Sequence, residues 1–227
     1  GVAPCDGHVD ASDIDDGLPV GPGGSRLGLA IKGACDRVAA LLGLLILSPL
    51  LLVLAAAVKA TSPGPVFFRQ ERAGLNGKPF RIYKFRTMVV GAEKIGMGYR
   101  TSSDDPRVTR LGRLLRQLSL DELPQLINIL KGEMSLVGPR PTLPYQVEKY
   151  TPRQRGRLLM RPGVTGWAQV HGRKRLTWPE RIKHDLWYVQ NWSLWLDVRI
   201  LLMTIPLVLR SEGVDDAGQG DAISRME

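Results

Sequence analysis

The chain of 227 residues has few residues that could cross-link it or hold a soft metal. It contains two cysteines, Cys5 and Cys35, and three histidines. Two cysteines cannot form a disulfide framework, and the scattered histidines lack the ligand spacing of a zinc site. The composition therefore excludes a disulfide-rich secreted domain and a zinc module. A reducing, cytoplasm-facing environment is expected.

Acidic residues are scarce in the body of the chain. Residues 26–210 hold 30 Lys and Arg against 12 Asp and Glu, while residues 1–25 carry five Asp and no base. Residues 211–227 carry five acids and one Arg. We predict that 1–25 is a disordered acidic tail and 211–227 a flexible tail. The basic body predicts an anionic partner, with phosphate the first candidate.

One long hydrophobic run is present, from Val38 to Val58, and it is long enough to cross a bilayer. Bases lie on both sides of it, beginning with Arg37 and Lys59, although cytoplasmic flanks are the ones that collect Lys and Arg. Ser48-Pro49 interrupts the run, and a proline there bends a helix. We therefore expect 26–60 to be a re-entrant helix-break-helix that enters and leaves one leaflet, with Ser48 and Pro49 at the break. A proline-kinked transmembrane span is the alternative.

The remaining residues, 61–210, predict a mixed and mostly helical domain. Val66–Arg72 and Phe80–Arg86 alternate in polarity around the turn Gly74-Leu-Asn-Gly77, which is typical of a β-hairpin. Helices are expected after Asp104-Asp105-Pro106 and from about Ser119 to Lys131. Residues 137–175, rich in Gly and Pro, predict an ordered loop, and Trp178 to Arg210 predicts amphipathic helices at a membrane surface. The expected fold class is α+β.

The segment Ser119-Leu-Asp-Glu-Leu-Pro-Gln125 places two carboxylates, Asp121 and Glu122, side by side in this basic domain. Neighbouring positive charge favours the ionised form of a carboxyl group, so both are expected to ionise easily. Ionised carboxylates can act as a nucleophile or as ligands of a hard cation such as Mg²⁺. Ser119 and Glu122 also have capping-box spacing, so the motif could serve only as a helix cap.

Two arginines lie in stiff loops that follow this motif's helix in the sequence. Pro139 and Pro141 restrict the backbone around Arg140, and Arg161 precedes Pro162-Gly163. A guanidinium held on a fixed loop can bind phosphate through two hydrogen bonds. Arg116 precedes Asp121 by five residues and is a further candidate. A network of structural ion pairs is the alternative for all three.

A series of motifs runs along about residues 29–210. They are Asp36, Ser48-Pro49, Phe68-Arg-Gln-Glu-Arg72, Lys84-Phe-Arg-Thr-Met88, Ser119 to Gln125, Lys131-Gly132, Gly138-Pro-Arg-Pro141 and Arg161-Pro-Gly-Val-Thr-Gly-Trp-Ala-Gln169. In this order they resemble the motifs of the bacterial sugar transferases, the monotopic phosphoglycosyl transferases that act on undecaprenyl phosphate. The resemblance favours the short form, which has only the catalytic domain and its re-entrant helix.

The resemblance implies transfer of sugar 1-phosphate from a UDP-sugar, such as UDP-glucose or UDP-galactose, to undecaprenyl phosphate with release of UMP. Asp121 would be the nucleophile of a ping-pong reaction, and Glu122 would assist with Mg²⁺ or with protons. Arg140 would bind phosphate, and Lys84 and Arg86 join Arg116 and Arg161 as candidates for the same role. Asp36 and Arg37 would anchor the membrane boundary.

The resemblance also implies a location on the cytoplasmic face of the bacterial inner membrane. The expected partners are the two substrates and membrane lipids, with a second copy of the chain as a further candidate. A membrane-docked basic protein that binds anionic lipid or nucleic acid is the rival function. It leaves the Asp-Glu pair unexplained, and stacking aromatics for nucleic acid are missing outside the C-terminal segment.

Overall fold

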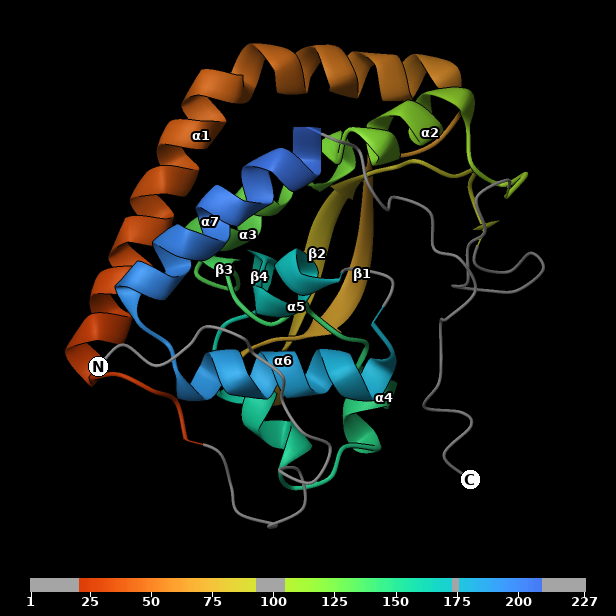
Figure 1. The fold of residues 1–227 in the computed structure, drawn as a ribbon. Helices are drawn as coiled ribbons and strands as arrows, with labels where there is room; N and C mark the ends of the chain where they lie inside the picture. The colour runs from red at the N-terminus through yellow and green to blue at the C-terminus, as the bar shows by residue number, and fades with distance from the viewer. Residues whose placement is uncertain (1–20, 93–104, 173–175, 210–227) are drawn as a thin grey trace.

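The computed structural model describes residues 21–92, 105–172 and 176–209, and Figure 1 shows their arrangement. Predictions for residues 1–20 and 211–227, including Cys5, lie outside this part of the chain. The α-helices are α1 (Arg26–Thr61), α2 (Arg110–Gln117), α3 (Gln125–Leu130), α4 (Pro144–Glu148), α5 (Trp167–His171), α6 (Trp178–Gln190) and α7 (Leu194–Leu209). The strands are β1 (Phe67–Ala73), β2 (Pro79–Phe85), β3 (Ser135–Val137) and β4 (Gly163–Thr165). Long helices with small sheets confirm the α+β class.

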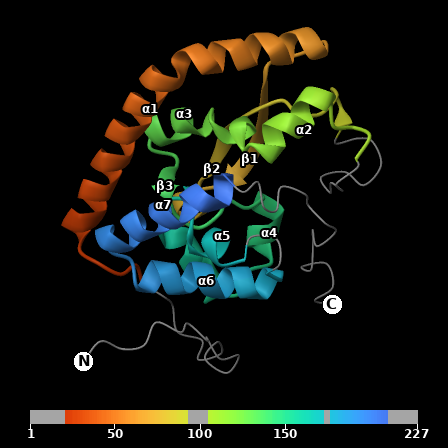
Figure 2. The same ribbon diagram turned by 45° about the horizontal axis from the view of Figure 1, so that its top comes forward.

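Helix α1 is a single helix of 36 residues that changes direction part-way along its length (Figures 1 and 2). Pro49 lies inside it and has no amide hydrogen to donate, while the Ser48 hydroxyl donates to the Leu45 carbonyl at 2.8 Å. In the described part of the chain, this is the one helix long and apolar enough to cross a membrane, and 11% of its most apolar 18 residues are buried. So exposed an apolar surface indicates contact with a membrane.

Both limbs of α1 pack on the same domain. In the first limb, Ala40 packs with Ile129 of α3 and with Met134. In the second limb, Leu54 and Val58 pack in a separate cluster with residues of β2 and α2. Because each limb of α1 packs against the same domain, the bend between the limbs is a defined feature of the fold.

Buried polar contacts fix the start of α1. Lys32 pairs with Asp197 of α7 at 2.6 Å, and the Asp36 carboxylate accepts the Ser135 hydroxyl of β3 at 2.6 Å. Tyr188 of α6 donates to Asp197 at 2.6 Å. A buried charge is tolerated where it is paired and hydrogen-bonded, so this network ties α1 to α6, α7 and β3.

The predicted hairpin is present, as β1 and β2 pair antiparallel with Phe68 opposite Lys84 and Arg72 opposite Phe80. Asn76 (φ 55°) and Gly77 (φ 75°) form its turn in the left-handed region, where Asn and Gly are the tolerated residues. The hairpin carries Lys84 towards the end of β2.

Residues 137–172, the described part of the loop predicted over 137–175, are more regular than expected. Strand β3 pairs in parallel with β4, with Val137 opposite Thr165, and α4, α5 and the 3-10 helix η5 (Gln154–Leu159) lie in the same stretch. A Cβ atom on Gly163 would lie 2.1 Å from the Gly138 nitrogen, so the loops that follow β3 and precede β4 touch through their backbones. Glycine is required where backbones approach this closely.

Two helix starts differ from prediction. Helix α2 begins at Arg110 with Thr109 as its cap, because the Thr109 hydroxyl accepts the Gly112 amide at 2.9 Å. Asp105, expected near the start of that helix, instead pairs with Arg107 at 2.7 Å. The helix expected over Ser119–Lys131 is split at Pro124 into the 3-10 helix η4 (Leu120–Glu122) and α3.

Candidate active site

The Asp-Glu pair lies in η4, between α2 and α3. Ser119 precedes it with φ 55° and makes no side-chain capping bond, so the capping-box prediction is wrong. A serine in the left-handed region carries a conformational cost of about 1 kcal/mol. The backbone turns sharply here and directs Asp121 and Glu122 into different surroundings. Strain of this kind is concentrated at functional sites.

Glu122 is held between two cations. Its Oε1 accepts Lys84 Nζ at 2.6 Å and Arg140 Nη2 at 3.1 Å. Burial alone would raise the pKa of Glu122, but the charges of Lys84 and Arg140 and their hydrogen bonds lower it to about 2. Glu122 is therefore ionised throughout the physiological range, as the sequence predicts.

Asp121 has different surroundings from Glu122. Its exposure is 9%, and no donor within the described ranges hydrogen-bonds to its carboxylate. Burial raises the pKa of Asp121, and the positive charges of Lys84, Arg116 and Arg140 only partly offset this effect and the repulsion from Glu122. Charge density alone predicts a lowered pKa for both carboxyl groups, and for Asp121 the direction is the opposite because the group is buried. A carboxylate without donors keeps its lone pairs available for attack.

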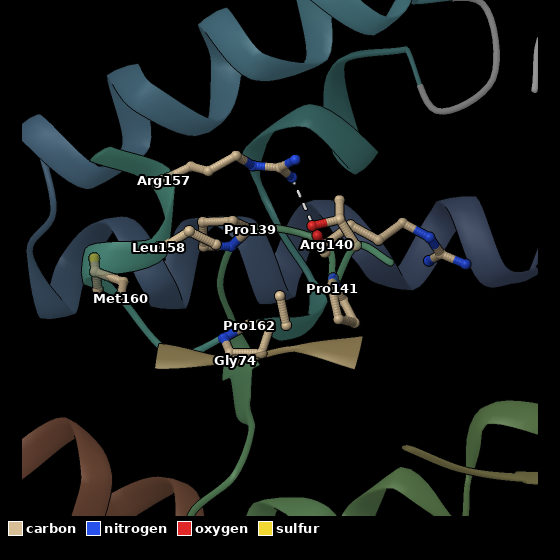
Figure 3. A pocket seen from close by; sticks show the side chains of 10 residues that line it. Gly74, Pro139, Arg140, Pro141, Arg157, Leu158, Met160 and Pro162 are labelled. Atoms are coloured by element: carbon tan, nitrogen blue, oxygen red, sulfur yellow. Dashed lines mark hydrogen bonds between the residues drawn. The ribbon is translucent and has the colours of Figure 1, made fainter. Parts of the chain in front are cut away.

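A hollow beside Glu122 collects three cations. It is lined by Arg72, Ile82, Lys84, Glu122, Gln125, Arg140, Pro141 and Gly163. A neighbouring hollow shares Arg140 and Pro141 and extends to Gly74, Pro139 and Pro162 (Figure 3). The first hollow thus brings together guanidinium and ammonium donors from β1, β2 and the Arg140 loop (Gly138–Pro141), groups of the kind that bind phosphate.

Arg72 and Gln125 line the hollow beside Glu122, although the sequence motifs did not identify them as site residues. Arg72 lies opposite Phe80, and cross-strand partners share one face of a hairpin. Period-two alternation then places Ile82 and Lys84 on that face too. Identifying Arg72 requires the pairing register of β1 and β2, because the register determines which side chains of the hairpin face the carboxylates.

The other predicted bases lie elsewhere. Arg116 donates to the Thr87 hydroxyl at 2.9 Å and acts on Asp121 only through its charge. Arg86 is buried and donates to the carbonyls of Ser62 (2.7 Å) and Pro63 (3.0 Å), so it holds the end of α1. Arg161 donates to the Gly132 carbonyl at 2.9 Å and lines neither hollow among the described residues.

The predicted membrane-boundary residues lie on α1. Asp36 is buried against β3 and also accepts the Leu136 amide at 3.4 Å. Arg37 is exposed, and its guanidinium donates back to the Gly33 carbonyl at 3.3 Å. Both residues precede the apolar limb in which Ser48 and Pro49 stand.

The carboxylate pair suits Mg²⁺ as a partial ligand set. No group of three His, Cys, Asp or Glu side chains that could hold a metal is found within residues 21–92, 105–172 and 176–209. Asp121 and Glu122 offer hard oxygen ligands on adjacent residues, and Mg²⁺ is commonly held by one or two carboxylates with substrate phosphates and water. The residues present therefore fit Mg²⁺ that arrives with a phosphorylated substrate.

Comparison with known proteins gives consistent results. The profile of the family "Bacterial sugar transferase" matches residues 27–211. The chain is 46% identical over 186 residues to the uncharacterized sugar transferase EpsL of Bacillus subtilis, covering 82% of this chain and 91% of that one. It is 44% identical over 218 residues to the UDP-glucose:undecaprenyl-phosphate glucose-1-phosphate transferase of Caulobacter vibrioides, covering 91% of this chain and 81% of the relative.

A third relative, from Aeromonas hydrophila, is a UDP-N-acetylgalactosamine-undecaprenyl-phosphate N-acetylgalactosaminephosphotransferase. It is 46% identical over 189 residues, which are 81% of this chain but 44% of the longer relative. The family match over residues 27–211 contains α1 from its second residue onward, the carboxylate pair and the Arg140 loop. The chain belongs to the bacterial sugar transferase family, as a member of the phosphoglycosyl transferase type.

Proposed function

We propose that this protein transfers sugar 1-phosphate from a UDP-sugar to undecaprenyl phosphate and releases UMP through a covalent intermediate on Asp121. The observation that carries the proposal is the contrast within the carboxylate pair. Glu122 is neutralised by Lys84 and Arg140, whereas Asp121 next to it has no hydrogen-bond donor among the described residues. The names of the Caulobacter and Aeromonas relatives give the same reaction type for those proteins.

In the first step, an Asp121 carboxylate oxygen forms a bond to the phosphorus that carries the sugar. The bond from that phosphorus to the bridging oxygen breaks, and UMP leaves with the electron pair. In the second step, a phosphate oxygen of undecaprenyl phosphate attacks the same phosphorus, and the Asp121 carboxylate is regenerated. Splitting one displacement into two is the usual advantage of a carboxylate nucleophile.

The surrounding cations bind and orient the diphosphate. Lys84 and Arg72 lie on one face of the hairpin, and the Arg140 side chain is 52% exposed, so it can reach an incoming phosphate. Phosphoryl transfer depends on positioning and on neutralising charge, which these groups provide. Mg²⁺ held by Asp121 and Glu122 with the substrate phosphates would supply further charge neutralisation. Glu122 keeps Lys84 and Arg140 in place before substrate binds.

A re-entrant course of α1 would serve this reaction. The two limbs of the bent helix pack on one domain, which supports an entry and an exit on the same side of the bilayer. The basic residues on both flanks support the cytoplasmic face of the bacterial inner membrane as that side. The apolar limb would then lie in the leaflet that carries the polyprenyl phosphate.

The topology can be tested with single-cysteine variants at Arg26 and Lys78, in a chain whose Cys5 and Cys35 are replaced by serine. A monotopic arrangement predicts that neither position in intact cells reacts with an impermeant maleimide. Labelling of one of the two from outside would show a transmembrane span.

The donor sugar is proposed to be a neutral hexose such as glucose. The glucose transferase from Caulobacter supports this choice, while the Aeromonas relative is named for N-acetylgalactosamine at similar identity. Both sugars therefore belong in the assay, together with galactose.

The decisive assay measures UMP release by purified protein from UDP-glucose, UDP-galactose and UDP-N-acetylgalactosamine with undecaprenyl phosphate. We expect release with at least one donor and none with Asp121→Asn, which keeps the side-chain size but removes the nucleophilic charge. Glu122→Gln should impair turnover as well. Release by Asp121→Asn near the wild-type rate would exclude Asp121 as the nucleophile.

A further inference from the structure

The Arg140 loop holds its shape without many amide donors. Pro139 and Pro141 have no N–H, so the loop depends on its carbonyl groups for hydrogen bonds. All four consecutive carbonyls from Pro139 to Thr142 accept one. The donors, in chain order of the acceptors, are the Gly163 amide (3.0 Å), Arg157 Nη2 (3.1 Å), Arg72 Nη1 (3.4 Å) and the Ala73 amide (2.9 Å).

Arg157 is the buried member of this set. Arg157 lies in η5, and its side chain is 3% exposed. The guanidinium forms an ion pair with Asp185 of α6. Its other terminal nitrogen donates to the Tyr150 hydroxyl at 2.6 Å, and the guanidinium lies 5.5 Å from the centre of the Trp178 ring. A guanidinium is planar and stays charged, so this enclosure leaves it few orientations.

The direction of the two arginines matters. Figure 3 shows Arg157 bonded to the carbonyl of Arg140, while the Arg140 side chain runs away from Arg157. The far end of that side chain reaches Glu122 at 3.1 Å. Arg157 therefore holds the backbone of Arg140 and leaves its guanidinium for the carboxylate pair and for substrate. Tyr150 adds a contact to Thr142 at 3.3 Å, two residues further on.

We infer that Arg157, locked by Asp185 and Tyr150, is a positioning residue that fixes Arg140 for the diphosphate of the donor. The inference rests on the proposed function. Arg157 does not touch the reacting atoms, and its effect passes through the Arg140 carbonyl. A single ammonium at this position cannot reach Asp185, Tyr150 and the Arg140 carbonyl together, so Arg157→Lys keeps the charge but loses the hold on the loop.

A double-mutant cycle on kcat/KM for UMP release tests this role. A misplacement of about 1 Å in a catalytic group can cost about 10²-fold, which is the loss expected for Arg157→Lys. In an Arg140→Ala background, the same substitution should change the rate less than about twofold, because the group that Arg157 positions is already gone. The matched control is Arg107→Lys, which alters another buried arginine paired with an aspartate, Asp105. Its effect should multiply with that of Arg140→Ala.

If the fold losses of kcat/KM for Arg157→Lys and Arg140→Ala multiply in the double variant, the inference is overturned and Arg157 is a purely structural residue. Full activity of Arg157→Lys would overturn it as well. If Arg157→Lys does not fold, Tyr150→Phe replaces it in the cycle, with a smaller loss and the same non-additivity expected. Wild-type protein in the same assay distinguishes failure of the positioning role from failure of the proposed function. Absence of UMP release by the wild type would reject the proposed function itself.

Discussion

The Arg140 loop and the loop Arg161–Gly163 have similar local sequences and different roles. Each has an arginine next to proline and glycine, and the two backbones touch where Gly163 meets Gly138. Yet Arg140 reaches Glu122 at 3.1 Å, while Arg161 donates to the Gly132 carbonyl at 2.9 Å, next to α1. One loop therefore presents its cation to the carboxylate pair, and the other uses its cation to fix the end of α3 near the membrane helix.

The difference shows what a stiff local sequence determines. Proline and glycine restrict the backbone, so both loops are ordered as expected. The direction of each arginine depends on which partner the fold brings near, which a local motif does not encode. The two loops can therefore be separated by experiments that distinguish catalysis from stability.

The largest contrast is expected for lysine substitutions at the two arginines. Arg140→Lys keeps the charge but loses the guanidinium fork, and we expect about 10²-fold lower kcat/KM with little change in melting temperature. Arg161→Lys should cost about 1 kcal/mol of stability with kcat/KM nearly unchanged. Kinetics and thermal unfolding of both variants check this. Equal activity losses in the two would contradict the assignment.

Lys84 is the second cation on the carboxylate pair, and its loss should show in the pH profile. Burial raises the pKa of Asp121, and Lys84 partly lowers it. Removing Lys84 raises this pKa further, so ionised Asp121 forms only at higher pH. Lys84→Met should therefore move the acid limb of kcat/KM to higher pH, in addition to lowering the rate.

Lys131 provides the control for this shift. It contacts the Tyr83 hydroxyl at 3.0 Å rather than either carboxylate. Lys131→Met should leave the acid limb where it is. An unshifted limb in Lys84→Met would mean that a group other than Asp121 governs it.

The contact between the loops can be tested at Gly163. An added Cβ would lie 2.1 Å from the Gly138 nitrogen and 2.4 Å from the Thr165 oxygen, both backbone atoms that cannot rotate away. Gly163→Ala should lower the free energy of unfolding by about 2 kcal/mol. Gly21→Ala, where nothing lies within 4 Å, should be close to neutral. Chemical denaturation of both variants measures the difference.

The smallest effect is expected at Ser119. Because its φ of 55° is left-handed, the β-branched Ser119→Thr should cost about 1 kcal/mol, while Ser119→Asn should be tolerated. A helix cap would accept threonine, since its hydroxyl can replace that of serine. Equal stability of Ser119→Thr and wild type in thermal unfolding would restore the capping interpretation.

The sequence predicted features that depend on local pattern. The hairpin followed from alternation, the bend in α1 from Ser48-Pro49, and the ionised state of Glu122 from charge density. Features that depend on tertiary partners were missed or misread. Ser-x-x-Glu resembled a cap because spacing alone carries no φ angle, and the raised pKa of Asp121 was missed because burial is not visible in charge counts.

Arg86 and Arg161 illustrate the same limit. Both stand in motifs rich in bases, and both donate to backbone carbonyls instead of lining the hollow beside Glu122. Arg72, which lines it, required the pairing register of β1 and β2. Sequence motifs therefore name segments, while the fold decides which of their basic residues line the hollow beside Glu122.

The most direct test of the account is the mass of the protein after incubation with a UDP-sugar in the absence of undecaprenyl phosphate. A nucleophilic Asp121 predicts a gain equal to one sugar phosphate, located by peptide mapping on Asp121 and absent in Asp121→Asn. Addition of undecaprenyl phosphate should then restore the original mass. UMP release with no adduct under any condition, or an adduct on another residue, would contradict a nucleophilic Asp121.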